Sequence, residues 1–227
     1  QTPNSKVLLD CGINPAATED SEKFPYLNLP EIGDLNSIDA VILSHAHLDH
    51  SGLIPYLYKM GYKGPVYLIE PTRDIAALLT LDFIGIAYKQ ASFPLYKAED
   101  VKEMVRHSIS LDFGEVTDIT PDIRITLYNA GHVLGASQVH INIGNGLHNL
   151  VYGADTKYAK TRLLDPAVNH FPRVETLIIE STYGAKEDIL PPRQETENKF
   201  IEIAKAVIAR NGKILLPELG LGHAQET

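Results

Sequence analysis

The sequence predicts an α/β protein with a layered core, and two observations support this. Between residues 38 and 90, short apolar runs alternate with longer stretches of helical spacing, an order that is typical of α/β layers. Five apolar runs also end on an ionisable side chain, as strands do where α/β sheets carry their sites. These side chains are Asp10, His45, His132, Asp155 and Glu180.

The composition is that of a globular chain, with 227 residues of which 44% are hydrophobic and 22% charged. The length suits one sizeable domain, or one domain and part of another. The chain begins with Gln1 and shows no signal-peptide pattern, so we expect an excerpt from a longer protein. No apolar run approaches the roughly 20 residues of a membrane span, so no membrane partner is expected. The single cysteine excludes an internal disulfide and suits a reducing cytoplasm.

The net charge of −9 argues against a broad basic face for nucleic acid on this part of the protein. Bound divalent cations would offset some of the carboxylates locally, because each ion brings two positive charges. The acidity is therefore compatible with a metal-dependent site.

The first half of the chain predicts short strands separated by helices. Val7–Asp10 is expected to be a buried strand that ends on a carboxylate. Residues 14–37, rich in Asn, Pro, Glu and Asp, predict a long surface loop of the kind that forms a lip over a site. Further strands are expected at 38–44 and 66–69, and helices at 53–60, 71–90 and 98–107.

The second half predicts mainly strands, one helix at 193–210, and the start of another at the C-terminus. The strands are expected at 123–128, 138–143, 150–152, 176–179 and 213–217, with 176–179 buried. Asn145-Gly146 predicts the turn of a hairpin. Because 138–143 alternates, Gln138, His140 and Asn142 are expected to face solvent, and His140 is not expected to be a ligand.

The chemistry is concentrated in the segment His45-Ala46-His47-Leu48-Asp49-His50, directly after an apolar run. His45 and His47 are two residues apart, so in extended backbone both side chains point the same way. With a third imidazole from His132 they would form a three-histidine face, which leaves a fourth position on zinc open. The glycines on both sides of His132 allow the backbone to place that imidazole at a strand end.

A second ion is expected beside the first. Asp49 and His50 begin the next turn and can face it, and Asp155 can bridge the two ions. Nitrogen-rich ligation favours zinc over magnesium or calcium. The motif could instead be a histidine-rich surface loop without a function. The position of the motif directly after a buried strand favours a metal site.

The two residues at the end of the first predicted strand, Asp10 and Cys11, also need an interpretation. Asp10 is either a turn residue or an acceptor that orients a metal-bound histidine. Cys11 is expected to be a small buried residue. The sequence contains no Ser-His-Asp or Cys-His nucleophile arrangement and no phosphate-binding glycine loop of the P-loop type.

Several of these motifs resemble those of the metallo-β-lactamase fold. They are L-L-D-C-G at 8–12, H-A-H-L-D-H at 45–50, G-H-V-L-G at 131–135 and G-A-D at 153–155. I-E-S-T-Y-G at 179–184 and the stretch at 216–226 resemble signatures of the β-CASP branch, the nucleic-acid-processing nucleases of that superfamily. The chain is most similar to the archaeal homologues of the cleavage and polyadenylation specificity factor endonuclease subunit, including at 24–28 and 61–67.

The resemblance implies an αββα sandwich that runs into the start of a β-CASP domain. Residues 1–181 would form the metallo-β-lactamase core, without its opening hairpin and closing strands, and residues 182–227 would begin the β-CASP domain. It also implies an enzyme that hydrolyses RNA phosphodiester bonds in RNA 3′-end processing or transcription termination. This would be an endonuclease, with 5′-to-3′ exonuclease activity left open, and a homodimer at full length.

The resemblance implies two zinc ions and a role for each motif residue. His45, His47 and His132 would bind the first ion, Asp49 and His50 the second, and Asp155 would bridge them. Asp49, Asp10 and Glu180 are the expected catalytic residues. Asp10 would orient the site, and Glu180 would act as a nearby supporting or proton-handling carboxylate. A further ligand of the second ion would come from a later strand, so that site is expected to be incomplete in this chain.

Two positions depart from the family pattern. His223 stands where arginine is usual and is not expected to be a replacement ligand, and Ala154 stands where glycine is usual. Two other functions remain open. One is a small-molecule hydrolase of the same fold, such as a thioesterase or lactonase, and the other is an inactive fragment that binds RNA or a partner.

Overall fold

The computed structural model describes residues 1–14, 17, 20–25, 27, 30, 32–218 and 220–226. The chain divides into two compact units, Gln1–Glu180 with Glu226, and Ser181–Gln225. Much of the loop predicted at 14–37 falls outside the described residues, as do Tyr26, Asn28 and Leu219 of the family motifs. Among the described residues, no helix is both long and apolar enough to cross a membrane.

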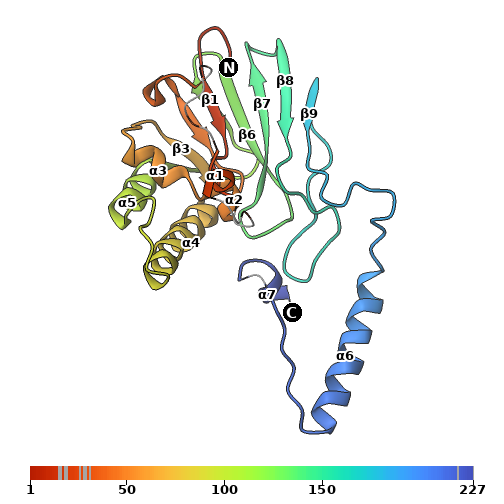
Figure 1. The fold of residues 1–227 in the computed structure, drawn as a ribbon. Helices are drawn as coiled ribbons and strands as arrows, with labels where there is room; N and C mark the ends of the chain where they lie inside the picture. The colour runs from red at the N-terminus through yellow and green to blue at the C-terminus, as the bar shows by residue number, and fades with distance from the viewer. Residues whose placement is uncertain are drawn as a thin grey trace. The chain divides into compact units, whose positions relative to one another are not determined.

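The first sheet of the larger unit is parallel. Its strands, in spatial order, are β1 (Val7–Leu9), β2 (Ala40–Ile42), β3 (Val66–Ile69) and β4 (Ser108–Leu111) (Figure 1). β2 and β3 are buried throughout, as expected of strands covered on both faces. The sequence predicted the first three strands but not β4, because β4 alternates serine with apolar residues over only four positions and lies at the sheet edge.

Helices connect these parallel strands, as crossover connections require. They are α2 (Leu48–Ser51), α3 (Ile54–Lys59), α4 (Glu70–Lys89) and α5 (Ala98–His107). Figure 1 shows α3, α4 and α5 together on one side of the first sheet. The predicted helices at 53–60, 71–90 and 98–107 are confirmed, with Pro55 and Pro71 in first turns, where proline is tolerated. The loop after β1 contains a short helix, α1 (Asp20–Lys23), and a 3₁₀ turn, η1 (Leu35–Ser37).

The second sheet is mainly antiparallel. Its strands, in spatial order, are β5 (Val116–Thr120), β6 (Ile123–Asn129), β7 (Ser137–Ile143), β8 (His148–Tyr152) and β9 (Thr176–Ile178). β8 and β9 are parallel, and the other neighbours are antiparallel. The predicted hairpin turn is confirmed between β7 and β8, where Asn145 and Gly146 both adopt positive φ (55° and 94°).

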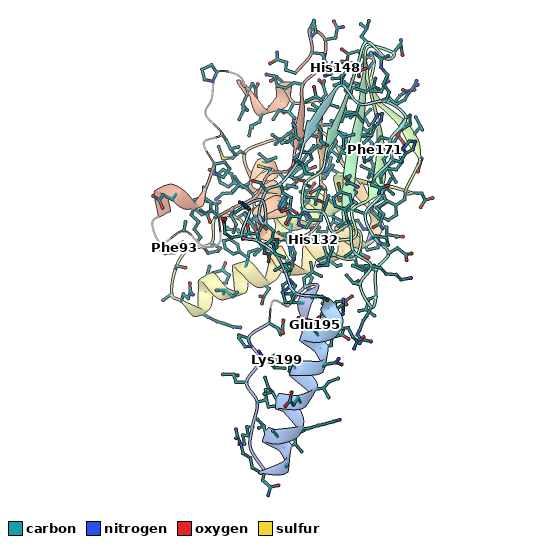
Figure 2. All side chains as sticks on the ribbon, turned by 90° about the vertical axis from the view of Figure 1, so that its right-hand side faces the viewer. Phe93, His132, His148, Phe171, Glu195 and Lys199 are labelled. Carbon is teal, nitrogen blue, oxygen red and sulfur yellow. The ribbon has the colours of Figure 1, made fainter. Side chains whose placement is uncertain are left out.

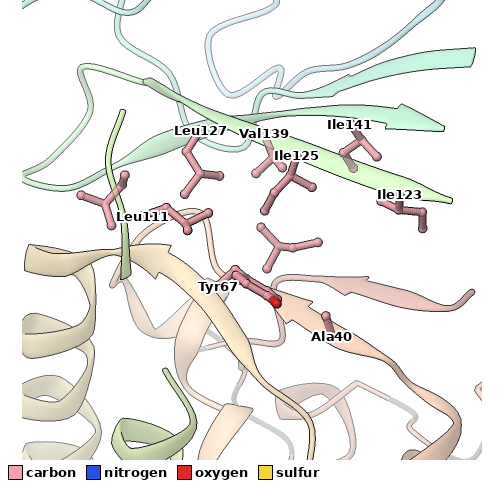
Figure 3. Close-up of a cluster of buried hydrophobic side chains, with 10 residues drawn as sticks. Ala40, Tyr67, Leu111, Ile123, Ile125, Leu127, Val139 and Ile141 are labelled. Atoms are coloured by element: carbon pink, nitrogen blue, oxygen red, sulfur yellow. The ribbon is translucent and has the colours of Figure 1, made fainter. Parts of the chain in front are cut away.

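The two sheets face each other across one apolar core. Figure 3 shows Tyr67 and Leu111 of the first sheet opposite Ile125 and Leu127 of the second. The resemblance implied an incomplete αββα sandwich, and this is confirmed: the described residues form two facing sheets with helices along one side of the first. On the outer face of the second sheet, the described covering is the irregular segment 157–175.

This segment overturns the prediction that Gln138 and His140 face solvent, since they are only 1% and 7% exposed. The His140 ring lies parallel to Phe171, with centroids 6.3 Å apart, and its Nε2 donates a hydrogen bond to the Arg173 carbonyl at 2.8 Å. Gln138 Nε2 donates to the Val168 carbonyl at 2.7 Å. The prediction that Gln138 and His140 point to the outer face of the sheet was correct, but on that face they contact the 157–175 segment and not solvent.

Three strand predictions need correction. β1 was predicted to be buried, but Val7, Leu8 and Leu9 are only half-buried because β1 is an edge strand of the first sheet. β9 was predicted to be buried, but Leu177 and Ile178 are exposed because β9 is an edge strand of the second sheet. The described residues 213–217 form no strand, since they have no hydrogen-bonded strand partner in the described part of the chain. The smaller unit does contain the predicted helix, α6 (Arg193–Ala209), and the terminal helix α7 (His223–Glu226) begins as expected.

Gly12 allows the loop after β1 to pass directly over the motif helix α2. A Cβ atom at Gly12 would lie 1.8 Å from the Asp49 carbonyl oxygen. The flanking amides hold this contact, because Cys11 N–H donates to the His50 carbonyl at 2.8 Å and Ile13 N–H to the Leu48 carbonyl at 2.9 Å. The turn of chain after β1 is therefore bonded along the backbone of the metal-binding motif.

We predict that Gly12→Ala lowers the free energy of unfolding by about 3 kcal/mol, the upper end of the cost of overpacking. Gly85→Ala is the matched control, because its Cβ would meet nothing within 4 Å inside α4. This control should be neutral or gain up to about 1 kcal/mol from helix propensity. Urea unfolding of both variants tests the prediction, and equal stabilities would contradict the close approach at Gly12.

Candidate metal centre

The candidate site lies where strands of both sheets end. β1 and β2 are parallel, and β6 and β8 both run antiparallel to β7, so β6, β8 and β9 share one direction. The predicted residues follow the carboxyl ends of these strands. They are Asp10 after β1, His45 after β2, His132 after β6, Asp155 after β8 and Glu180 after β9.

Three imidazole nitrogens and one carboxylate form the first group of candidate ligands. His47 Nδ1 lies 3.1 Å from both His45 Nε2 and His132 Nε2. Asp155 Oδ2 lies 3.4 Å from His132 Nε2 and 3.8 Å from His45 Nε2. Four ligand atoms about 2.0–2.1 Å from a tetrahedral zinc would be roughly 3.3 Å apart. The spacing of these donors therefore fits a tetrahedral ion.

The chemistry of the donors points the same way. The nitrogens of His45 and His132 both approach the same His47 nitrogen, which has either one N–H or one in-plane lone pair. One proton cannot complete two good linear hydrogen bonds at that atom. A cation between the rings would instead satisfy all three nitrogens.

A second group of candidate ligands lies next to the first and shares Asp155 with it. Asp49, His50 and Asp155 offer ligand atoms that are all within 4.8 Å of one another. His50 Nε2 is 3.4 Å from Asp155 Oδ1 and 3.8 Å from Asp49 Oδ2. Asp155 thus directs one oxygen towards each group. The Asp49 side chain is 50% exposed, so this group opens to solvent.

The buried carboxylate of Asp10 supports both groups from behind. Its Oδ2 accepts hydrogen bonds from His50 Nδ1 at 2.7 Å, Ser44 Oγ at 2.7 Å and Tyr152 Oη at 2.8 Å. Its Oδ1 accepts from the Ser44 backbone N–H at 2.7 Å. The bond to His50 holds the proton on Nδ1 and turns Nε2 towards Asp49 and Asp155. Of the two interpretations that the sequence left open, these bonds favour an acceptor that orients a histidine, and the role of Asp10 in metal binding stays a prediction.

Ser44 extends this support to the first group. Its hydroxyl donates to Asp10 and can therefore accept a hydrogen bond from His45 Nδ1, which lies 3.0 Å away. This arrangement leaves His45 Nε2 without a proton and facing the other ligands. The Ser44 carbonyl also accepts bonds from the backbone N–H and the hydroxyl of Ser137, at 2.9 and 3.0 Å. Ser44 thereby links the two sheets and the metal-binding motif.

Sequence reasoning missed Ser44 and Tyr152. The signal for Ser44 was a polar residue at the end of an apolar run, directly before His45. The signal for Tyr152 was an aromatic hydroxyl three residues before Asp155, on the strand that delivers it. Neither signal identifies its partner, because both side chains bond to Asp10, which is far away in the sequence.

The position of His132 depends on two glycines in its loop and on contacts of that loop with the 157–175 segment. Gly131 and Gly135 adopt positive φ values of 66° and 80°. A Cβ at Gly131 would lie 2.5 Å from the Lys157 carbonyl oxygen, and one at Gly135 would lie 2.6 Å from Thr72 Oγ1. The His132 loop is therefore held between the segment that follows Asp155 and the first turn of α4. This is the backbone freedom that the flanking glycines predicted.

Ala154 and Glu180 frame the shared carboxylate. Ala154 adopts a φ of 49°, which glycine reaches without strain, so the glycine that the resemblance implied at this position would suit this backbone. Glu180 Oε1 accepts a hydrogen bond from Thr156 N–H at 3.1 Å, next to Asp155. Glu180 therefore lies beside the centre but outside both groups.

Without a metal ion, the ionisable side chains of the candidate centre shift one another's pKa values. Burial, reinforced by the neighbouring histidines, lowers the pKa of His45 well below its usual value. Burial also lowers the pKa of His132. Burial acts the same way on His50, but Asp10 and Asp155 together outweigh it and raise the pKa of His50 to about 10. The hydrogen bond with His50 lowers the pKa of Asp155. These shifts in pKa keep Asp155 ionised and His45 and His132 neutral, as ligation requires, whereas His50 holds a proton that a bound ion would have to displace.

The other histidines of the larger unit lie outside both groups of candidate ligands. Figure 2 shows His148 at the far end of the second sheet from His132. His148 Nε2 lies 2.9 Å from Thr176 Oγ1. His140 is buried beneath Phe171, so it is not a ligand, as expected, although for a different reason.

The sequence is similar to known proteins over its whole length. Residues 1–180 match the metallo-beta-lactamase superfamily domain. Three archaeal proteins named transcription termination factor FttA resemble the chain, with 54% identity in Methanothermobacter thermautotrophicus and 50% in both Methanococcus maripaludis and Thermococcus kodakarensis. Each comparison covers 100% of this chain but only 35% or 36% of the relative. The chain therefore spans about a third of the length of these relatives.

We predict that Asp10→Asn weakens metal binding by about 10- to 100-fold, the usual range for groups that orient a ligand. An amide N–H₂ facing His50 Nδ1 would shift the ring proton to Nε2, the atom that must bind the ion. Competition with a chromophoric chelator measures the affinity. Asp165→Asn, on the exposed 157–175 segment, is the control, and equal affinities for the two variants would contradict the role of Asp10.

We also predict that the metal-free chain loses stability as the pH rises from 6.5. The pKa of His50 is raised from 6.5 to about 10 on folding. Its contribution is therefore complete below pH 6.5 and is lost as pH rises towards 10. Urea unfolding in EDTA between pH 6 and 8.5 checks this, and His50→Gln should flatten the profile. A His50→Gln profile as steep as that of the native chain would refute the assignment.

Proposed function

Because this chain belongs to the metallo-beta-lactamase superfamily, we propose that it forms the metal-binding part of a zinc-dependent ribonuclease. The proposed reaction is hydrolysis of RNA phosphodiester bonds in RNA 3′-end processing or transcription termination. One observation carries the proposal: two groups of ligands share Asp155, as a two-ion hydrolytic centre requires. The similar proteins named as transcription termination factors support RNA as the substrate.

The proposed ligands divide between two ions. Those of the first ion are His45, His47, His132 and Asp155, and those of the second are Asp49, His50 and Asp155. The nitrogen-rich first group favours zinc over magnesium or calcium. Such a pair of bound ions supplies Lewis acidity to a phosphoryl oxygen and lowers the pKa of water towards neutrality.

The residues of this chain have distinct proposed tasks. Asp10 fixes the ring of His50 directly and the ring of His45 through Ser44. Asp49, half exposed at the open side, faces the position where a phosphodiester would enter. Glu180 steadies the segment after Asp155 through Thr156 N–H, and carrying a proton is its second proposed role.

We propose a two-domain division of this chain and a dimeric assembly of the longer protein. Residues 1–181 would belong to the metallo-β-lactamase core, and residues 182–227 would begin a β-CASP domain. The longer protein would act as a homodimer and cleave RNA internally, with 5′-to-3′ exonuclease activity still open.

We predict that His47→Ala and Asp49→Ala each abolish RNA hydrolysis by the full-length protein, because each removes a ligand that no other residue of its group replaces. EDTA should have the same effect, and added zinc should restore activity. Gel analysis of a labelled single-stranded RNA provides the measurement. His170→Ala is the control, because this histidine is exposed and outside both groups. Cleavage of thioesters in place of RNA would favour the small-molecule hydrolase.

We further predict that this chain binds its first zinc more tightly than any second one. The first group has four donors and the second has three, one of them shared. His132→Ala should weaken the tight site, whereas Asp49→Ala should leave it unchanged. Competition titration with a chromophoric chelator resolves the two steps, and two zinc ions held equally tightly would contradict the assignment.

A further inference from the structure

A surface cavity of about 580 Å³ that is widely open to solvent adjoins the exposed carboxylate of Asp49. Its volume falls in the range of small-molecule sites. The described residues that line it belong mainly to the loop after β1, and they include Ile13, Asn14, Glu22, Phe24 and Pro25. None of these five residues belongs to either group of candidate ligands, so the cavity requires a separate explanation.

One wall of this cavity is joined rigidly to the metal centre. Gly12 also lines the cavity and lies against the Asp49 backbone, where a Cβ would be 1.8 Å from the carbonyl oxygen. Ile13 N–H donates to the Leu48 carbonyl at 2.9 Å, and Asn14 N–H donates to the Lys23 carbonyl at 2.8 Å. These bonds connect the motif helix to α1. This wall of the cavity therefore keeps its position relative to Asp49.

The aromatic wall is held by a cation. The Lys23 ammonium lies 5.9 Å from the centroid of the Phe24 ring and 5.7 Å from that of Phe83 on α4. Attraction between an ammonium and a ring face orients the ring. Lys23 and Phe24 both line the cavity, so Phe24 offers an aromatic ring on which a flat ligand could stack.

The charges of the lining favour an uncharged ligand with hydrogen-bond donors. Glu22 and Lys23 place one carboxylate and one ammonium in the lining, and the charge of Asp49 would be offset by the proposed second ion. The lining therefore offers no excess positive charge for a phosphate group, which is better placed at the metal centre. Carboxylates accept hydrogen bonds from amino groups such as those on cytosine. An aromatic face beside carboxylate acceptors thus suits a flat base that carries an amino group.

We propose that this cavity binds a nucleobase with an exocyclic amino group, on the nucleotide next to the phosphodiester that enters the metal centre. The base stacks on Phe24 and its amino group donates to Glu22. This inference rests on the proposed ribonuclease function and adds a base-binding site to it. It also gives the loop after β1 the task of selecting the substrate.

Titration of the ¹⁵N-labelled chain with free nucleosides tests the proposal, since nucleosides are neutral, need no metal and cannot be cleaved. Cytidine should shift the amide signals of Gly12, Ile13 and Asn14. Uridine, which has an oxygen in place of the amino group, should bind several-fold more weakly, and ribose should cause no shift. Glu22→Gln should reduce the preference for cytidine.

Variants of Phe24 separate stacking from simple filling of the cavity. Phe24→Leu should weaken cytidine binding by about fivefold or more, the usual loss when a stacking ring is removed. Phe24→Tyr should retain binding. Phe93→Leu is the matched control, because Phe93 is fully exposed and does not line the cavity (Figure 2). Signals away from the loop report whether each variant is folded.

The proposal is overturned if Phe24→Leu binds cytidine like the native chain, or if cytidine, uridine and ribose behave alike. Hydrolysis of bis(4-nitrophenyl) phosphate by the full-length zinc-loaded protein tests the ribonuclease proposal separately, because this diester has no nucleobase. Loss of hydrolysis with intact cytidine selectivity would count against the nuclease alone. Normal hydrolysis without that selectivity would count against the base site alone.

Discussion

The arrangement of the candidate centre depends on one buried carboxylate. Asp10 accepts hydrogen bonds from Ser44 and His50, on either side of the motif after β2, and from Tyr152 on β8, and so joins two segments that are distant from it in the sequence. Its backbone takes a left-handed φ of 57°, which aspartate tolerates better than most residues. A buried carboxylate is costly unless each oxygen has partners, and here both have them. The same bonds that satisfy Asp10 orient two ligand rings.

Local patterns in the sequence were enough to predict most elements and to single out six candidate ligands, whose binding of an ion stays a prediction. The resemblance to the metallo-β-lactamase fold was confirmed, and the structure brings the six side chains together as the motifs implied. These successes have a local physical basis. The motif directly follows a buried strand, and glycines flank His132 at the two positions where the backbone takes positive φ.

The remainder could not be predicted because it depends on contacts between distant segments. His140 alternates like a surface residue, but its burial depends on Phe171 and Arg173, which lie in irregular chain without periodicity. Ser44 and Tyr152 are recognisable only once Asp10 is known to lie between them. Residues 213–217 have strand-like composition, but a strand also requires a partner.

The docked segment 157–175 has a consequence for how the centre would come apart. It follows Asp155 directly, and its Lys157 carbonyl faces Gly131, beside His132. Local opening of a protein usually releases a contiguous unit as a whole. If this segment detached, both Asp155 and His132 would lose their support in one event. The hydrogen bonds from Gln138 and His140 to this segment would therefore help to hold the candidate centre together, even though neither residue belongs to it.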